Sequence, residues 1–391
     1  MYDILNYVSG FIWGPFTLIL ILGTGIFLSL GLKGFTLTYI AVAFKQLFSK
    51  EEDSSSGEIS SFQSLTTALS ATVGTGNIAG VATAIFVGGP GAIFWMWVSA
   101  IFGMATKFAE AFLAIKYREK NEVGETIGGP MYYIKNGLTS KFIVFAYLFA
   151  AAGMIAALGI GNGVQVNSVS QVINNEFGFS TFSIGIVIAI LVALVILGGI
   201  KSIGNITSKL VPVMSLVYIL GGLLIIILNS SQVGYVFNLI VTSAFTSTAA
   251  TGGFAGATVW MALRYGVARG VFSNEAGLGS SPIAHAAAKT NNPVKQGMIS
   301  MLEPLIDTLI VCTITAFVIL MSNQWVGDIN GAVLTVASFE NLLANGKYIV
   351  IFGLILFSFS TIIGWSYYGE KCVEFLFGSG VIIYYLSLIH I

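Results

Sequence analysis

Charged side chains are scarce in this chain. Asp, Glu, Lys and Arg make up only 9% of its 391 residues, whereas 56% are hydrophobic and the mean hydropathy is +0.89. Soluble domains carry about 25% charged residues, so the composition excludes a soluble fold. It predicts an all-α polytopic membrane protein embedded in a lipid bilayer. The formal net charge is zero, which argues against nucleic acid as a partner.

Potential metal ligands and nucleophiles are also few. The two cysteines, Cys312 and Cys372, lie in or beside apolar runs, and there are two histidines. This set predicts neither a disulfide framework nor a metal centre nor another cofactor. We find no nucleophile–base pair that would indicate an enzyme, because His285 is expected in a loop and Asp307 has no obvious partner.

Long apolar runs are abundant. Nine are long enough to cross about 30 Å of hydrocarbon, and they lie near residues 11–32, 66–87, 91–106, 142–162, 182–200, 210–229, 238–263, 304–321 and 348–368. A tenth begins near Val381. The first run follows Asp3 rather than a basic segment, so we interpret it as a retained span and not as a signal peptide.

The basic residues fall on one side of these spans. Every Lys and Arg except Lys347 lies in or beside the loops after the first, third, fifth, seventh and ninth spans. Because cytoplasmic loops carry the excess of basic residues, we expect these loops inside the cell and the N-terminus outside. The expected location is the cell membrane.

Two spans contain segments that weaken a helix. The second has "VGTGN" at Val73–Asn77, and the seventh has "TAATGGFAGA" at Thr248–Ala257. They are five spans apart and therefore cross the membrane in opposite directions, as the discontinuous helices of an inverted repeat do. Unwound backbone at membrane depth is tolerated where it lines a cavity. The plainer interpretation is that the glycines only allow close helix packing.

Several stretches resemble one transporter family. Residues 88–103 read "GGPGAIFWMWVSAIFG", 273–290 read "SNEAGLGSSPIAHAAAKT", and 364–372 read "GWSYYGEKC". They are similar to the alanine or glycine:cation symporters, the sodium:alanine symporter family, over residues 1–385. The resemblance implies the inverted-repeat fold of the amino acid–polyamine–organocation superfamily, with leucine-transporter-like architecture and one extra N-terminal span.

The resemblance also implies a sodium site. The backbone carbonyls of Ser70 and Val73 would meet the hydroxyls of Ser360 and Thr361 and the carbonyl of Phe357, all neutral oxygens that suit a hard cation. The hydroxyls have an alternative role in bonding back to their own helix. A second sodium site, built on Asn77 and a hydroxyl, is doubtful because Ala249 stands at the matching position.

The substrate is expected beside the first interrupted helix. Free amides at Thr72, Gly74, Thr75, Gly76 and Asn77 would bind its carboxylate, because a helix N-terminus carries partial positive charge. By family analogy the ammonium would meet Gln165, with Asn162 and Asn167 near it. Phe254, Thr361 and Trp365 would complete a small pocket.

Carboxylates near membrane depth are further candidates. Asp307 would relay protons or tune the cation, whereas Glu110 and Glu303 are expected to pair with Lys or Arg at cytoplasmic helix ends. The loop 264–297 carries Arg264, Arg269, Asn274, Glu275 and His285, which are expected to form either an inside gate of ion pairs or a solvated loop.

Together these features predict a secondary symporter that imports alanine or glycine with sodium by alternating access. A proton-coupled carrier and a non-transporting, transporter-like receptor are the alternatives. We expect residues 1–60 to form the extra span and a cytoplasmic loop, 61–230 the first five-helix repeat, and 231–385 an incomplete second repeat. Residues 386–391, "LSLIHI", resemble a translated sequencing adaptor.

Overall fold

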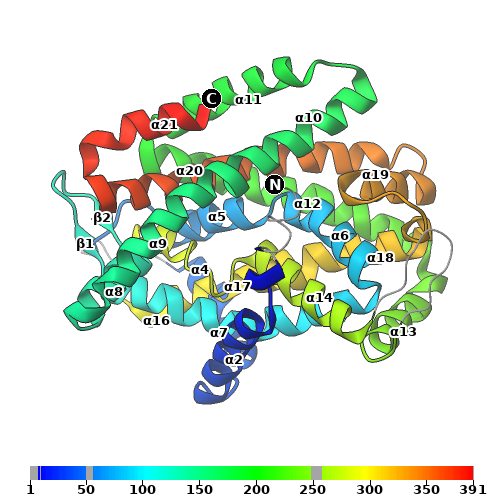
Figure 1. The fold of residues 1–391 in the computed structure, drawn as a ribbon, viewed down its shortest axis with the longest axis horizontal. Helices are drawn as coiled ribbons and strands as arrows, with labels where there is room; N and C mark the ends of the chain where they lie inside the picture. Colours follow the sequence, from blue (N-terminus) through cyan, green and yellow to red (C-terminus); the bar gives the residue numbers. More distant parts are fainter. Residues whose placement is uncertain (1–7, 9, 50–55, 248–257, 391) are drawn as a thin grey trace.

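The computed structural model describes residues 8, 10–49, 56–247 and 258–390 and is built almost entirely of helices (Figure 1). The helices of the first half are α2 (Pro15–Gly31), α3 (Phe35–Thr38), α4 (Ile40–Leu47), α5 (Ser61–Thr72), η1 (Gly76–Gly80), α6 (Val81–Gly88), α7 (Gly91–Lys116), α8 (Pro130–Gly137), η2 (Ser140–Phe142), α9 (Ile143–Ala156), η3 (Ala157–Gly163), α10 (Val164–Phe177), and α11 (Thr181–Ile196). The short strands β1 (Glu119–Lys120) and β2 (Thr126–Ile127) form an antiparallel hairpin with Glu119 opposite Ile127.

The second half continues the helical pattern. It contains α12 (Gly199–Leu228), η4 (Ser230–Gln232), α13 (Val233–Ser243), α14 (Val259–Asn274), α15 (Pro282–Ala286), α16 (Pro293–Ser300), α17 (Leu302–Pro304), η5 (Leu305–Cys312), α18 (Thr313–Ser322), η6 (Gln324–Val326), α19 (Gly331–Leu342), α20 (Lys347–Phe377), η7 (Ser379–Val381) and α21 (Ile382–His390). In Figure 1, α2 projects from the edge opposite α10, α11 and α21.

Five helical stretches in the described residues are long and apolar enough to cross a membrane, and a sixth is the bent pair α5 and η1–α6. They are Gly91–Lys116, Ser140–Phe177, Gly199–Leu228, Pro293–Ser322 and Lys347–Phe377. The expected first and fifth spans correspond to the shorter apolar helices α2 and α11. The helical membrane class is therefore confirmed, whereas nine spans in an inverted repeat remain a prediction.

The first interrupted helix is broken where the glycines predict it. Helix α5 starts with a capping box, in which Ser60 and Gln63 satisfy each other's backbone amides, and it ends at Val73 in an extended conformation. The chain then turns by 50° into η1 and α6. The Gly74 N–H donates to Asn77 Oδ1 at 2.8 Å, so it does not continue the ladder to the carbonyl four residues back.

The expectation of a loop over residues 264–297 is wrong, whereas the inside gate stays a prediction. This segment is not a loop, because α14 continues to Asn274 and is followed by α15 and α16. The small residues of α14 explain its burial, since a Cβ on Gly266 would overlap Ala92 of α7 and one on Gly270 would overlap Ser99. The other expected interruption, Thr248–Ala257, lies outside the described residues.

The tally of cytoplasmic basic residues needs one correction. The Arg264 side chain donates from Nε to the Trp13 carbonyl at 3.1 Å, so Arg264 lies beside the start of the first apolar helix. If the N-terminus is outside, Arg264 is outside as well. Most of the basic residues still fall in the opposite set of loops, and the orientation remains a prediction.

Candidate functional site

Three π-helical segments carry polar side chains into the interior. They are η1, η3 and η5, and each interrupts an otherwise regular span. Such segments are frequent at functional sites because they free backbone groups. Asn77 of η1 contacts Asp307 of η5, with Nδ2 2.6 Å from Oδ1. Asp307 Oδ2 accepts from Thr308 at 2.7 Å, so this carboxylate does have partners.

A small cavity adjoins the break between α5 and η1. Its volume is about 10 Å³, roughly the space that one water molecule needs. It is lined by Ala71, Thr72, Gly74, Gly76, Ile160, Gln165, Phe272, Glu275, Thr361 and Trp365. Six of the nine residues predicted to bind the substrate are in this set, and they come from four separate helices.

Gly74, Gln165 and Thr361 converge at this cavity. The Thr75 N–H donates to Gln165 Oε1 at 3.3 Å, and the Gln165 amide donates back to the Ile160 carbonyl at 3.2 Å. A Cβ on Gly74 would overlap Thr361 Oγ1. Glycine is therefore required at position 74 for α20 to approach the broken backbone.

The expectation of free amides is only partly met. The amides of Gly74, Thr75 and Asn77 already have partners within the protein, namely Asn77 Oδ1, Gln165 Oε1 and the Gly74 carbonyl. Neither Thr75 nor Asn77 lines the cavity. The turn that frees these amides from the helix also gives most of them hydrogen-bond partners. The sequence alone does not show such bonds.

The predicted sodium ligands lie where α5 meets α20. Thr361 Oγ1 is buried and has no hydrogen-bond partner among the described residues. The other predicted hydroxyl ligand, Ser360, bonds back to the Phe357 carbonyl at 2.9 Å. The Ser70 hydroxyl, which is not a predicted ligand, bonds back to the Thr67 carbonyl at 2.7 Å. Ser70 Oγ lies 2.8 Å from where a Cβ on Gly364 would be, so the two helices are in close contact.

Asn162 and Asn167 face a different space. Both line a cavity of about 880 Å³ between α10 and α11. None of the described residues that line that cavity is charged, whereas a zwitterion carries two charges that need partners. Although it is much larger, we do not assign the substrate to it. Phe254 lies outside the described residues.

Sequence reasoning missed Phe272 and Glu275 as cavity residues. Both come from the end of α14, where the helix stops and Glu275, Gly277 and Gly279 adopt positive φ angles of 57°, 89° and 75°. The run of charges from Arg264 to Glu275 suggested a loop. The glycines of "NEAGLG" were the available signal for the end of this helix.

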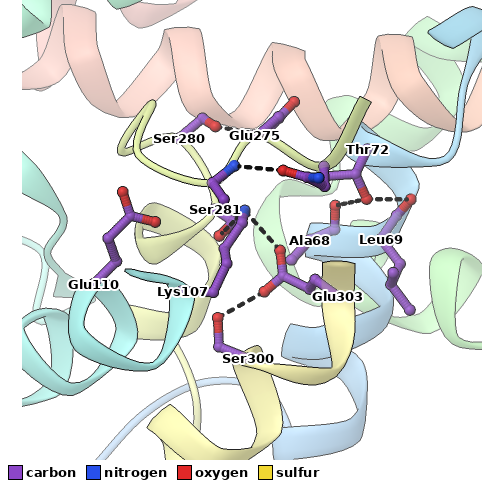
Figure 2. A network of polar contacts seen from close by, with 12 residues as sticks. Ala68, Leu69, Thr72, Lys107, Glu110, Glu275, Ser280, Ser281, Ser300 and Glu303 are labelled. Atoms are coloured by element: carbon purple, nitrogen blue, oxygen red, sulfur yellow. Dashed lines mark hydrogen bonds and ion pairs between the residues drawn. The ribbon is translucent and has the colours of Figure 1, made fainter. Parts of the chain in front are cut away.

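A buried polar network lies beneath this break (Figure 2). Lys107 Nζ of α7 lies 2.9 Å from Glu303 Oε2 and 2.7 Å from Ser281 Oγ. Glu303 Oε1 lies 2.6 Å from His285 Nε2, and Ser300 donates to the same oxygen at 2.7 Å. The side chains of Lys107, Glu303 and His285 are fully buried.

This network also reaches α5. The Gln296 amide lies 2.6 Å from His285 Nδ1 and donates to Ser64 Oγ at 2.8 Å. The pairing of Glu303 with a lysine is as expected from the sequence. The expectation that His285 lies in a loop is wrong, because it is on α15 and completely buried. Glu110 bonds the Gly279 amide at 3.1 Å instead of forming an ion pair within the described residues.

Arg118 holds the neighbouring segments together. Its guanidinium donates to the carbonyls of Ser56, Ala286, Ala288 and Thr290 at 2.6–3.0 Å. The same segments are joined by a parallel β-bridge between Ile59 and Ala288. Burial lowers the pKa of Arg118 from its ordinary value, and the carbonyl oxygens compensate for part of the lost hydration.

The long apolar helices and the interrupted span define a helical membrane protein. The model of the sodium:alanine symporter family matches residues 1–391, and the chain belongs to that family. It is 51% identical to the sodium/alanine symporter AgcS of Methanococcus maripaludis, over 99% of this chain and 86% of the relative. It is also 38% identical to the probable sodium/glutamine symporter GlnT of Bacillus subtilis, over 96% of this chain and 78% of that relative.

Proposed function

We propose that this protein imports alanine or glycine together with sodium by alternating access. The observation that carries the proposal is the buried Thr361 hydroxyl, which lacks a hydrogen-bond partner among the described residues and faces the broken backbone at Gly74. A buried polar group without a partner costs free energy, and a bound ion or substrate would supply that partner. Family membership and the name of the 51% identical relative support sodium and alanine.

In this proposal the sodium ion lies between α5 and α20. It takes the carbonyls of Ser70, Val73 and Phe357 and the hydroxyls of Ser360 and Thr361. The substrate carboxylate lies against the broken backbone near Gly76, with Gln165 beside it and Trp365 closing the pocket. The cavity of about 10 Å³ must widen to admit any amino acid, so the choice of alanine rests on the family and on the name of the 51% identical relative.

One sodium ion supplies enough free energy for this task. Moving one charge through 100 mV releases about 2.3 kcal/mol, and a tenfold sodium gradient adds about 1.4 kcal/mol. Together they sustain a roughly 500-fold gradient of a neutral amino acid. A second sodium site is therefore not needed for strong accumulation.

The test is uptake of radiolabelled alanine and glycine into proteoliposomes, with and without a sodium gradient. Thr361→Val removes the proposed sodium ligand at nearly constant volume. Ser366→Ala is the matched control, because Ser366 is on the same helix but its hydroxyl bonds back to the Ile362 carbonyl. We expect sodium-dependent uptake that the first variant loses and the control retains. Absence of uptake by the wild type would contradict the proposed function.

A proton-coupled carrier is the second candidate, and one contact favours it. The Asp307 carboxylate is fully buried and bonds Asn77 at the broken helix, so a change in its protonation would alter that helix directly. Uptake that follows a pH gradient and ignores sodium would select this alternative. Asp307→Asn would then abolish the pH dependence.

A further inference from the structure

Within the described part of the chain, Glu275 is the only charged residue that lines the small cavity beside the broken helix. Its side chain is 2% exposed, and one carboxylate oxygen, Oε2, accepts a hydrogen bond from Ser280. Among the described residues, no Lys, Arg or His forms an ion pair with it. Lys107 attracts this carboxylate without contacting it. An ionised carboxylate buried without a cation in contact is costly, so this side chain is poised to receive one.

The position of Glu275 on its helix also indicates that its carboxylate receives a cation. It caps the C-terminus of α14 with φ at 57°, where glycine or asparagine is the usual residue. The C-terminus of a helix carries partial negative charge and favours a cation, so an acid here is unfavourable on both counts. An acidic residue with a positive φ angle at a helix C-terminus is found where a bound ligand offsets its unfavourable free energy.

The opposite wall of the cavity offers the complementary charge. The backbone near Gly76 begins η1, and a helix N-terminus favours an anion. The two walls are in contact, because a Cβ on Gly76 would lie 3.3 Å from the Ser273 Cα of α14. The Gly76 wall therefore suits a carboxylate and the Glu275 wall an ammonium group, and these two walls must separate to admit an amino acid, because the cavity has room for about one water molecule.

We propose that the Glu275 carboxylate is the counter-ion of the substrate ammonium group. The inference rests on the proposed transport function and assigns to Glu275 a contact that the sequence placed on Gln165. Ser280 orients the carboxylate through its hydrogen bond, and Figure 2 shows the two side chains side by side above the Lys107–Glu303 pair. Sodium lies elsewhere in this arrangement, between α5 and α20.

The test pairs one change in the protein with one change in the ligand. Affinities for alanine and for propionate, which is alanine without its ammonium group, are measured by calorimetry on the purified full-length gene product in sodium buffer. For Glu275→Gln we expect alanine affinity to fall at least about 30-fold, by the coupling typical of close buried charge pairs. Propionate affinity should stay constant or improve, because a repelling charge has been removed.

Three comparisons keep the inference separable from the proposed function. Glu110→Gln removes another buried carboxylate that does not line the cavity, and it should leave alanine affinity unchanged. Ser280→Ala keeps the charge and should weaken alanine binding less than Glu275→Gln does, which provides an answer if the latter variant fails to fold. Binding of radioactive ²²Na⁺ without substrate should be the same in all of them.

The results that would overturn the inference are specific. If wild-type protein binds alanine and Glu275→Gln binds it within threefold of wild type, the ammonium contact is elsewhere. Equal weakening of alanine and propionate would mean that the substitution only distorts the pocket. Loss of ²²Na⁺ binding with retained alanine affinity would assign Glu275 to the sodium ion. Absence of binding by the wild type would instead refute the proposed function.

Discussion

The buried pair of Lys107 and Glu303 makes one substitution unusually informative. Glu303→Gln removes the carboxylate that contacts the Lys107 ammonium. The ammonium then keeps hydrogen bonds to the Ser281 hydroxyl and the new amide, while Glu110 and Glu275 attract it without an ion-pair contact. Breaking a buried ion pair by removing one partner typically costs 3–5 kcal/mol. At about 2 °C per kcal/mol for a large domain, we expect an apparent melting temperature roughly 6–10 °C lower.

The opposite substitution should be milder. In Lys107→Met the Glu303 carboxylate keeps two partners, His285 Nε2 at 2.6 Å and the Ser300 hydroxyl at 2.7 Å. The double variant contains neither buried charge, so its stability should exceed that of Glu303→Gln. Removing both members of a buried pair is often nearly neutral.

The assay is thermal unfolding in detergent, followed by the loss of the monodisperse peak in size-exclusion chromatography. Lys135→Met is the matched control, because it breaks the exposed pair with Glu119, and exposed pairs contribute only about 0–1 kcal/mol. If the double variant is as unstable as the two single effects added together, the two charges are not coupled and our reasoning is refuted.

Three further outcomes follow from contacts around the site. Gly74→Ala should abolish alanine binding while the protein still folds, because the methyl group overlaps Thr361 Oγ1; calorimetry that gives wild-type affinity would contradict this close approach. Asn77→Ala should lower stability by about 2–4 kcal/mol, because it leaves the Gly74 amide and Asp307 short of a partner, and an unchanged melting temperature would contradict it. Arg118→Lys should destabilise by about 2–3 kcal/mol, because an ammonium group cannot reproduce the fork of bonds to four carbonyls. Its effect should exceed that of Lys120→Met on the adjacent hairpin, and equal melting temperatures would refute this role.

The helical membrane class and six of the ten residues that line the small cavity could be predicted from the sequence and its family resemblance. Gly74 and Gly76 break the helix through a local effect. The break depends only on residues close in sequence, so the sequence predicts it. The end of α14 could not be found in this way. Arg264 and Glu275 look like loop residues because their partners are set by tertiary contacts, the Trp13 carbonyl for one and Ser280 for the other.

The partners of buried titratable groups could not be predicted from the sequence either. The sequence indicates that Glu303 needs a cation but does not specify which one, because Lys107 is 196 positions away. For His285, the alanines around it gave no sign of complete burial. Periodicity predicts which segments are helical, whereas the choice among distant partners depends on how the helices pack.

The Arg118 contacts and the β-bridge have a mechanical consequence. Ile59 and Lys289 are joined by a backbone bond of 2.8 Å, and the Glu58 amide bonds the Ala287 carbonyl at 2.9 Å. These hydrogen bonds therefore join the start of α5 to the end of α15. Arg118 joins both of them to the end of α7. Any rearrangement that moves the start of α5 must move these segments together as one rigid body. The turn at Val73–Thr75, where α5 ends, is the nearest point at which the backbone can bend as a hinge.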